Sequence, residues 1–237
     1  KVGAPEWTTD APTDAEIILE VAGRACYRSW KPGLNLNITK VREGNEEYLQ
    51  HIIEVGHGSV LEHGWNIFIL DKVSRIFTHE LVRHRVGVSY SQESLRFVRL
   101  DKIDFWMPFI FKNHPKSAEL ISIITETVEF LEKQQGRLAE VLEIEKEKKF
   151  DVKKKLTSAM RRIAPEGLAT TIIWGVNFRT LRHIIERRTD VSAEEEMRLV
   201  IGQVAEIVKV KFPNIFKDYQ IEIVDGLPWY KTEHQKV

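Results

Sequence analysis

Apolar residues recur every three or four positions along much of the chain, a spacing that predicts amphipathic helices because it gathers these residues on one helix face. The clearest case is segment 116–149, where Leu120, Ile123, Ile124, Val128 and Leu131 share one side. Similar periodicity predicts helices over residues 17–27, 39–55, 73–84, 151–163, 178–189 and 192–212.

Polar residues mark the starts of several of these helices. Thr13 and Ser192 are each followed three positions later by a glutamate, which is the spacing of a helix capping box. Thr39 and Asn177 also stand where a side chain can cap the helix that follows.

Shorter apolar stretches predict a few strands. Residues 65–70 alternate in the manner of a strand, 170–176 is typical of a buried strand, and 95–100 and 221–224 are short candidates. These strands do not alternate regularly with helices, so the pattern favours an α+β fold in a single domain spanning 1–237 over a doubly wound sheet. Residues 1–12 are expected to form an irregular lead-in, and residues 219–237 a C-terminal tail.

The charge balance limits the possible partners. Lys plus Arg and Asp plus Glu both number 35, so the formal net charge is zero. This argues against a nucleic-acid-binding protein or one drawn to an anionic membrane. Any anion must therefore be bound by a local cluster of cations.

Three absences suggest a cytoplasmic protein. No apolar run approaches the roughly 20 residues of a membrane helix, and the first residues lack a signal-peptide pattern. The single cysteine, Cys26, rules out an internal disulfide. Because Cys26 lies in an apolar helical segment, we expect it in the buried core.

The most unusual stretch is 79–97. Arg83, His84 and Arg85 follow one another directly, and successive helix positions point about 100° apart, so they cannot all face solvent on one side. Some must point into a cleft or an interface, where an anionic ligand would offset the cost of burying charge. Gly87 allows the backbone to turn after them.

A second cationic cluster lies between Arg161 and Arg188. Arg179, His183 and Arg187 are spaced four residues apart and share a helix face. With Asn177 at the N-terminus of that helix, they form a good environment for a phosphate. A third cluster is the Gly-rich polar loop 57–63 between a predicted helix and a predicted strand.

Together these motifs resemble the flavin-dependent thymidylate synthases, the ThyX family. Arg83-His84-Arg85 followed by Ser94 and Arg96 resembles the family signature. Other motifs follow in the family's order and approximate spacing: Gly56-His57 with Glu62-His63, Arg161 ahead of Pro165, Trp174 to Arg179, and Arg187 to Asp190. The likeness covers roughly residues 15–215.

The resemblance implies both a fold and a reaction. The fold is a helix-rich α+β domain with a small, mainly antiparallel sheet flanked by helices, assembled as a homotetramer with FAD at subunit interfaces. The reaction methylates dUMP to dTMP: methylenetetrahydrofolate gives the one-carbon unit, NADPH reduces the FAD, and tetrahydrofolate is released.

The resemblance also assigns site residues by position. Arg188 would lie near the uracil carbonyls, Ser94 and Arg161 at the nucleotide phosphate, and His57 over the flavin near the folate or nicotinamide; Arg188, Ser94 and His57 are the catalytic candidates. The FAD-binding candidates are Ser59, Glu62, Arg83, His84, Arg85, Asn177, Arg179 and His183. The dUMP-binding candidates are Glu80, Gln92, Glu93, Ser94, Leu95, Arg96, Arg161 and Arg188.

The chain departs from the family pattern in four places. One extra residue stands between Arg85 and Ser94, within segment 86–88, where Gly87 can absorb it. Glu80 replaces a common glutamine, and a carboxylate accepts hydrogen bonds but cannot donate them. Ser192 and Phe97 replace a common histidine and tyrosine. Two alternatives stay open. Glu80 and the extra residue motivate a family paralogue acting on another pyrimidine nucleotide, and the arginine stripes could serve as phosphate contacts of a non-enzymatic nucleotide- or nucleic-acid-binding protein.

The remaining polar residues have simpler interpretations. The histidines lack the spacing of a metal site, so we expect no metal, and His63 and His79 should be hydrogen-bonded structural residues. Arg162 and Arg182 are interpreted as surface charges beside functional ones.

Overall fold

The computed structural model describes residues 6–96, 101–235 and 237, and it divides into two compact units. The first unit contains residues 1–67, 84–89 and 175–237, and the second contains 68–83 and 90–174. Neither unit is one continuous stretch, because the chain passes from one to the other after residues 67, 83, 89 and 174. The expectation of a single domain stays a prediction.

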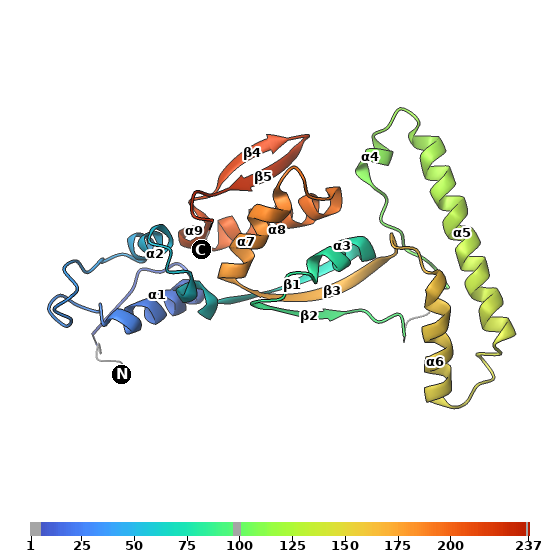
Figure 1. The fold of residues 1–237 in the computed structure, drawn as a ribbon, viewed down its shortest axis with the longest axis horizontal. Helices are drawn as coiled ribbons and strands as arrows, with labels where there is room; N and C mark the ends of the chain where they lie inside the picture. Colours follow the sequence, from blue (N-terminus) through green and yellow to red (C-terminus); the bar gives the residue numbers. More distant parts are fainter. Residues whose placement is uncertain (1–5, 97–100, 236) are drawn as a thin grey trace. The chain divides into compact units, whose positions relative to one another are not determined.

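Helices dominate both units (Figure 1). The first unit contains α1 (Asp14–Tyr27), α2 (Asn45–Glu54), the 3-10 helix η1 (Gly58–His63), α7 (Phe178–Thr189), α8 (Glu195–Lys211), α9 (Pro213–Phe216), β4 (Gln220–Val224) and β5 (Leu227–Lys231). The second contains α3 (Arg75–Leu81), α4 (Phe109–Lys112), α5 (Ser117–Val141), α6 (Phe150–Met160) and η2 (Arg161–Ile163). The strands β1 (Trp65–Ser74), β2 (Val88–Gln92) and β3 (Ala169–Asn177) each contribute residues to both units.

The three shared strands form one sheet in the order β1-β3-β2. The amide of Asn177 donates to the carbonyl of Gly87 and that of Glu93 to the carbonyl of Thr171, so β2 and β3 are antiparallel. A separate antiparallel hairpin pairs β4 with β5. The predicted α+β class with a small, mainly antiparallel sheet is therefore confirmed.

The core of the first unit lies around α7, which packs against α8, β5 and η1. The ring of Phe178, at the start of α7, lies 4.9 Å from that of Phe212, and both side chains are buried. Asn177 caps α7 by accepting a hydrogen bond from the Thr180 amide, as its position predicts.

Arg182 on α7 is buried, so its interpretation as a surface charge is wrong. Its two terminal nitrogens each donate to one carboxylate oxygen of Asp218, both at 2.7 Å. Burial alone would raise the pKa of Asp218, but the hydrogen bonds from Arg182 hold it below its ordinary value. Arg182 is therefore a structural residue, and its bidentate pair ties α7 to the segment after α9.

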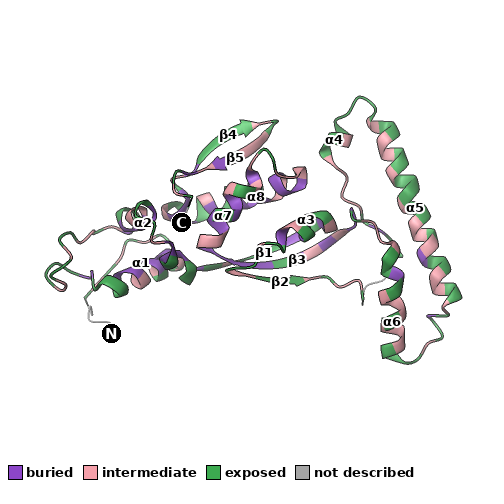
Figure 2. Cartoon of the chain, viewed as in Figure 1, coloured by how far each residue is buried: buried purple, intermediate pink, exposed green. Residues whose placement is uncertain are grey.

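The second unit buries Phe77 and Leu81 of α3 together with Trp174. Val128 and Leu131 of α5 pack against a smaller buried cluster of Ile103 and Leu168. Apart from Gln135, α5 carries only half-buried and exposed residues (Figure 2).

Several predicted helix boundaries are wrong. The helix predicted over 73–84 is only α3, because β1 continues to Ser74, whose side chain caps the helix, and the helix ends at Leu81. Arg83, His84 and Arg85 therefore lie beyond the helix instead of in its last turn. The helix predicted over 39–55 begins at Asn45 after an uncapped start, and the one over 116–149 ends at Val141.

Three further expectations need correction. Ser192 does not cap α8: it hydrogen-bonds Asp190, and Glu194 caps the helix instead. Cys26 is exposed instead of buried. Residues 95 and 96 lie in a turn, and the remainder of the predicted strand 95–100, with Phe97, lies outside the described residues.

Candidate functional site

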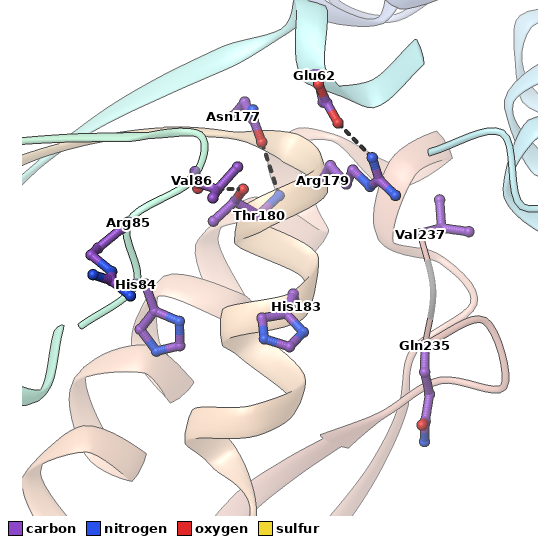
Figure 3. Close-up of a pocket in the computed structure, with 10 residues that line it drawn as sticks. All are labelled: Glu62, His84, Arg85, Val86, Asn177, Arg179, Thr180, His183, Gln235 and Val237. Atoms are coloured by element: carbon purple, nitrogen blue, oxygen red, sulfur yellow. Dashed lines mark hydrogen bonds and ion pairs between the residues drawn. The ribbon is translucent and has the colours of Figure 1, made fainter. Parts of the chain in front are cut away.

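A cavity of about 390 Å³ lies in the first unit, next to the start of α7 (Figure 3). It is bordered by η1, by the segment after Arg83, and by the last residues of the chain. Its lining residues are Glu62, His84, Arg85, Val86, Asn177, Arg179, Thr180, His183, Gln235 and Val237. All the cofactor-binding candidates except Ser59 and Arg83 are among them.

The segment from His84 to Gly87 is held against α7 by two hydrogen bonds. The Thr180 hydroxyl donates to the carbonyl of Val86 at 2.9 Å, and the Asn177 amide donates to the carbonyl of Gly87 at 2.9 Å. Gly87 adopts a left-handed φ of 68°, and a Cβ there would lie 2.4 Å from polar atoms of Asn177 and Thr180. The predicted turn at Gly87 therefore exists, and only glycine fits it.

One side of the cavity holds an ion pair. Arg179 Nη1 lies 2.5 Å from Glu62 Oε1, and both side chains are a little less than half exposed. A Cβ on Gly58 would lie 2.7 Å from Arg179 Nε, so the glycine gives this arginine room to lie against η1.

Two histidines line the other side of the cavity, and Arg188, which is not in the lining, hydrogen-bonds one of them. The rings of His84 and His183 meet edge to face, with centroids 6.0 Å apart. Burial lowers the pKa of His183, and Arg187 and Arg188 lower it further, so this imidazole is neutral at pH 7. Arg188 Nε donates to His84 Nε2 at 3.0 Å, which brings a predicted catalytic residue to a predicted cofactor residue.

The remaining candidates in the first unit lie apart from this cavity. Ser59 is exposed on η1. His57 stacks on Tyr27, with ring centroids 5.5 Å apart and an interplanar angle of 20°, and its Nδ1 lies 3.2 Å from the tyrosine hydroxyl. His57 lines a second cavity, of about 240 Å³.

The substrate-binding candidates other than Arg188 belong to the second unit, as does Arg83, which is exposed. Gln92 donates from Nε2 to the Thr78 hydroxyl at 3.0 Å, and the Ser94 hydroxyl accepts from the Arg96 amide at 3.3 Å. Glu93 and Leu95 lie in the same run at the end of β2, Glu80 lies on α3, and Arg161 begins η2.

Arg75 is a residue that the sequence patterns did not single out. It donates from Nη2 to the carbonyl of Glu93 at 3.1 Å, and its buried Nε has no hydrogen-bond partner among the described residues. Burial lowers the pKa of Arg75; the charge of Glu93 opposes this and that of Arg161 adds to it. Arg75 is thus electrostatically coupled to two substrate-binding candidates. Arg75 is the first residue of α3, directly after Ser74, and nothing in the sequence around it indicates a binding residue.

Among the described residues, no group of three or more histidine, cysteine or acidic side chains could hold a metal ion. His63 Nδ1 lies 3.2 Å from the carbonyl of Val60, and His79 Nδ1 lies 3.3 Å from Glu166 Oε2, so both have structural partners as predicted. Within the part of the chain that the structure describes, no helix is long and apolar enough to span a membrane.

Comparison with known proteins identifies relatives along nearly the whole chain. A model of the family described as "Thymidylate synthase complementing protein" matches residues 9–214. The chain is 37% identical over 228 residues to the flavin-dependent thymidylate synthase of Mycobacteroides abscessus, an alignment that covers 93% of this chain and 86% of the relative. It is 34% identical to the corresponding protein of Corynebacterium diphtheriae and 35% identical to that of Mycobacterium marinum, with the same coverage.

Proposed function

The chain belongs to the flavin-dependent thymidylate synthase family and is an enzyme, and from this premise we propose the reaction that it catalyses. It methylates dUMP to dTMP, with methylenetetrahydrofolate as the one-carbon donor and NADPH as the reductant acting through FAD. Tetrahydrofolate is released. We propose that the protein is located in the cytoplasm.

The observation that carries the proposal is the lining of the larger cavity. Arg85 and Arg179 supply positive charge, and Glu62 balances only one of the two. The start of α7 adds the positive end of a helix dipole. This donor set suits the pyrophosphate of a dinucleotide, because arginine holds phosphate oxygens with paired hydrogen bonds. FAD therefore fits the residues present.

The protein's own residues hold and orient the cofactor and the substrates. When bound, the flavin supplies the hydride that completes the methyl group. Glu62, Arg85, Asn177, Arg179, His84 and His183 hold the cofactor, with Ser59 and Arg83 as further contacts. Arg188 lies near the uracil carbonyls, where its charge stabilises the negative charge that develops on the pyrimidine ring. His57 lies on the folate or nicotinamide side.

The nucleotide is bound by the run at the end of β2 and by residues around it. Ser94 and Arg161 hold the phosphate, and Arg75, coupled to Arg161 and Glu93, joins them as an electrostatic support. Further contacts come from Glu80, Gln92, Glu93, Leu95 and Arg96.

We further propose that the enzyme assembles as a homotetramer with its sites at subunit interfaces. One face of β1 supports this, because Trp65, Ile67 and Ile69 alternate along it and are 50%, 75% and 71% exposed. A row of exposed apolar side chains on a strand is typical of a surface that another chain covers. Light scattering that gives the mass of a single chain would contradict this assembly.

The reaction is tested with dUMP carrying tritium at carbon 5. The FAD-loaded protein, given NADPH and methylenetetrahydrofolate, should release tritium and form dTMP. FAD-loaded protein that does neither would contradict the proposal and favour the paralogue acting on another pyrimidine nucleotide, which Glu80 motivates. Protein that binds no FAD would contradict both.

A further inference from the structure

The cavity of about 240 Å³ that His57 lines has a composition of its own. It lies among the end of α1, segment 29–42, α2 and His57 in the first unit, and it shares no lining residue with the larger cavity. Its lining residues are Arg24, Tyr27, Ser29, Ile38, Lys40, Arg42, Tyr48, His51, Ile52 and His57. None of them carries a carboxylate.

Flat and apolar surfaces make up much of its wall. Tyr27 stacks on His57 at one end, while Tyr48 and Ile52 are buried. The Tyr48 ring is overlaid by the Arg24 guanidinium, whose carbon lies 4.5 Å from the ring centroid. Burial raises the pKa of Tyr48 to about 12, so its hydroxyl, which is buried next to Gly23 of α1, stays protonated. Such walls suit a planar aromatic ring.

Arg24 builds this wall instead of binding a ligand. Its Nε donates to Glu20 at 2.8 Å, its Nη1 to the carbonyl of Ser29 at 2.8 Å, and its Nη2 to the carbonyl of Arg42 at 2.7 Å. The side chain is buried, and all three nitrogens are already bonded. Arg24 therefore fixes the two ends of segment 29–42 against α1.

The available positive charge comes from Lys40 and Arg42. Both share one carboxylate: Glu47 Oε1 lies 2.7 Å from Lys40 Nζ and 3.9 Å from Arg42 Nε. Burial lowers the pKa of His51, and Arg42 lowers it further, so His51 is neutral at pH 7. Lys40 and Arg42 thus give the lining itself a net positive charge beside an aromatic slot. The carboxylates that face these cations and His51, which are those of Glu47 and Glu54, lie outside the lining.

We propose that this cavity binds the end of a co-substrate in which a flat ring is joined to an anionic group. The ring lies against Tyr27 and Ile38, the less buried apolar residues of the lining, and the anion takes the place of Glu47 as a partner of Lys40 and Arg42. This inference rests on the proposed function, whose two co-substrates both have such an end: the aminobenzoyl-glutamate of a folate, and the adenosine 2′-phosphate of NADPH. His57, the residue expected nearest the reacting parts of those molecules, lines this cavity.

Calorimetric titration of the FAD-loaded full-length chain tests this with two probes, p-aminobenzoyl-glutamate and adenosine 2′,5′-bisphosphate. Binding of the first identifies the folate as the source, and binding of the second identifies the nicotinamide dinucleotide. Arg42→Gln should lower the affinity for whichever probe binds by about tenfold, because one charge-assisted hydrogen bond is lost. Glu47→Gln should tighten it, because the competing carboxylate is gone.

Two further variants complete the test. Lys217→Gln is the matched control, since Lys217 is an exposed cation paired with Glu46 outside this cavity, and it should leave binding unchanged. Ile38→Trp keeps both cations but fills the slot, so it should abolish binding even if Arg42→Gln fails to fold.

The inference is overturned if neither probe binds, or if both Arg42→Gln and Ile38→Trp bind as the wild type does. The same titrations on the FAD-free chain separate this outcome from a failure of the proposed function. A chain that binds a probe in the slot but takes up no FAD supports the cavity and contradicts the flavin reaction.

Discussion

Arg188 Nε donates a hydrogen bond to His84 Nε2 across 3.0 Å, joining the last turn of α7 to the segment that follows the signature arginine Arg83. His84 is the acceptor, so its Nε2 carries no proton in this arrangement. In the proposed reaction, Arg188 serves the pyrimidine and His84 the flavin. Through this bond His84, a proposed cofactor-binding residue, orients Arg188, a proposed substrate-binding residue.

Replacing Arg188 with alanine should lower turnover about a hundredfold or more while flavin affinity changes little, because its proposed partner is the pyrimidine. The measurements are kcat for dTMP formation and the dissociation constant for FAD. Arg137→Ala, at an exposed arginine on helix α5 of the other unit, is the control and should retain most activity. Equal losses of turnover and FAD binding in the Arg188 variant would reject this role.

Replacing His84 should reduce both functions. His84→Ala removes the acceptor that orients Arg188, and a hydrogen bond to a charged group is worth roughly 1.5–3 kcal/mol, so kcat should fall by about ten- to a hundredfold. FAD affinity should fall too, because His84 lines the cofactor cavity. His84→Gln, which keeps an acceptor, should recover part of kcat. If it recovers none, His84 does not act through Arg188.

Gly87→Ala should loosen the segment that carries His84 and Arg85. The left-handed backbone costs about 1–2 kcal/mol for a residue with a Cβ, and the new methyl group would collide with Asn177 and Thr180. Chemical denaturation and FAD titration should both show a loss. Gly136→Ala is the matched control, since a Cβ there meets nothing within 4 Å in helix α5, and it should raise stability by about 0.5–1 kcal/mol. Unchanged FAD affinity in Gly87→Ala would show that the turn is dispensable.

Asp218→Asn should destabilise the fold by about 3–5 kcal/mol, because it leaves the buried Arg182 without its charge partner. The wild-type pKa of Asp218 is depressed, so this stabilisation is present above its unfolded value of about 3.8 and is lost as pH falls through the lower folded value. Urea unfolding at pH 7 and near pH 3 should therefore show a difference between wild type and variant that shrinks in acid. Glu222→Gln, at the exposed pair with Lys231, should cost less than 1 kcal/mol.

The sequence predicts some elements closely because their signals are local. Asn177 caps α7 and the helix ends at Thr189, as expected, and the strand before it lies within one residue of its predicted bounds. The helix expected over 73–84 fails because apolar spacing does not reveal that β1 continues to Ser74. The hairpin partner β5 had a readable signal, since Asp225 and Gly226 form a two-residue turn with positive φ at both positions.

Other features depend on contacts that no local pattern contains. The partner of Arg182 lies 36 residues away, so burial of that arginine could not be read from α7 alone. Arg188 and His84 are 104 residues apart, and only the fold brings them together. The cofactor-binding candidates, in contrast, follow from the resemblance of the chain's motifs to a family, and most of them line one cavity.

The visible absorption spectrum of the purified protein, recorded after incubation with FAD and removal of the unbound flavin, is the most direct test that the chain binds this cofactor. We expect a yellow protein that retains FAD in equimolar amount to the chain, and an Arg179→Ala variant that retains less. A colourless wild-type protein that retains no FAD would contradict it.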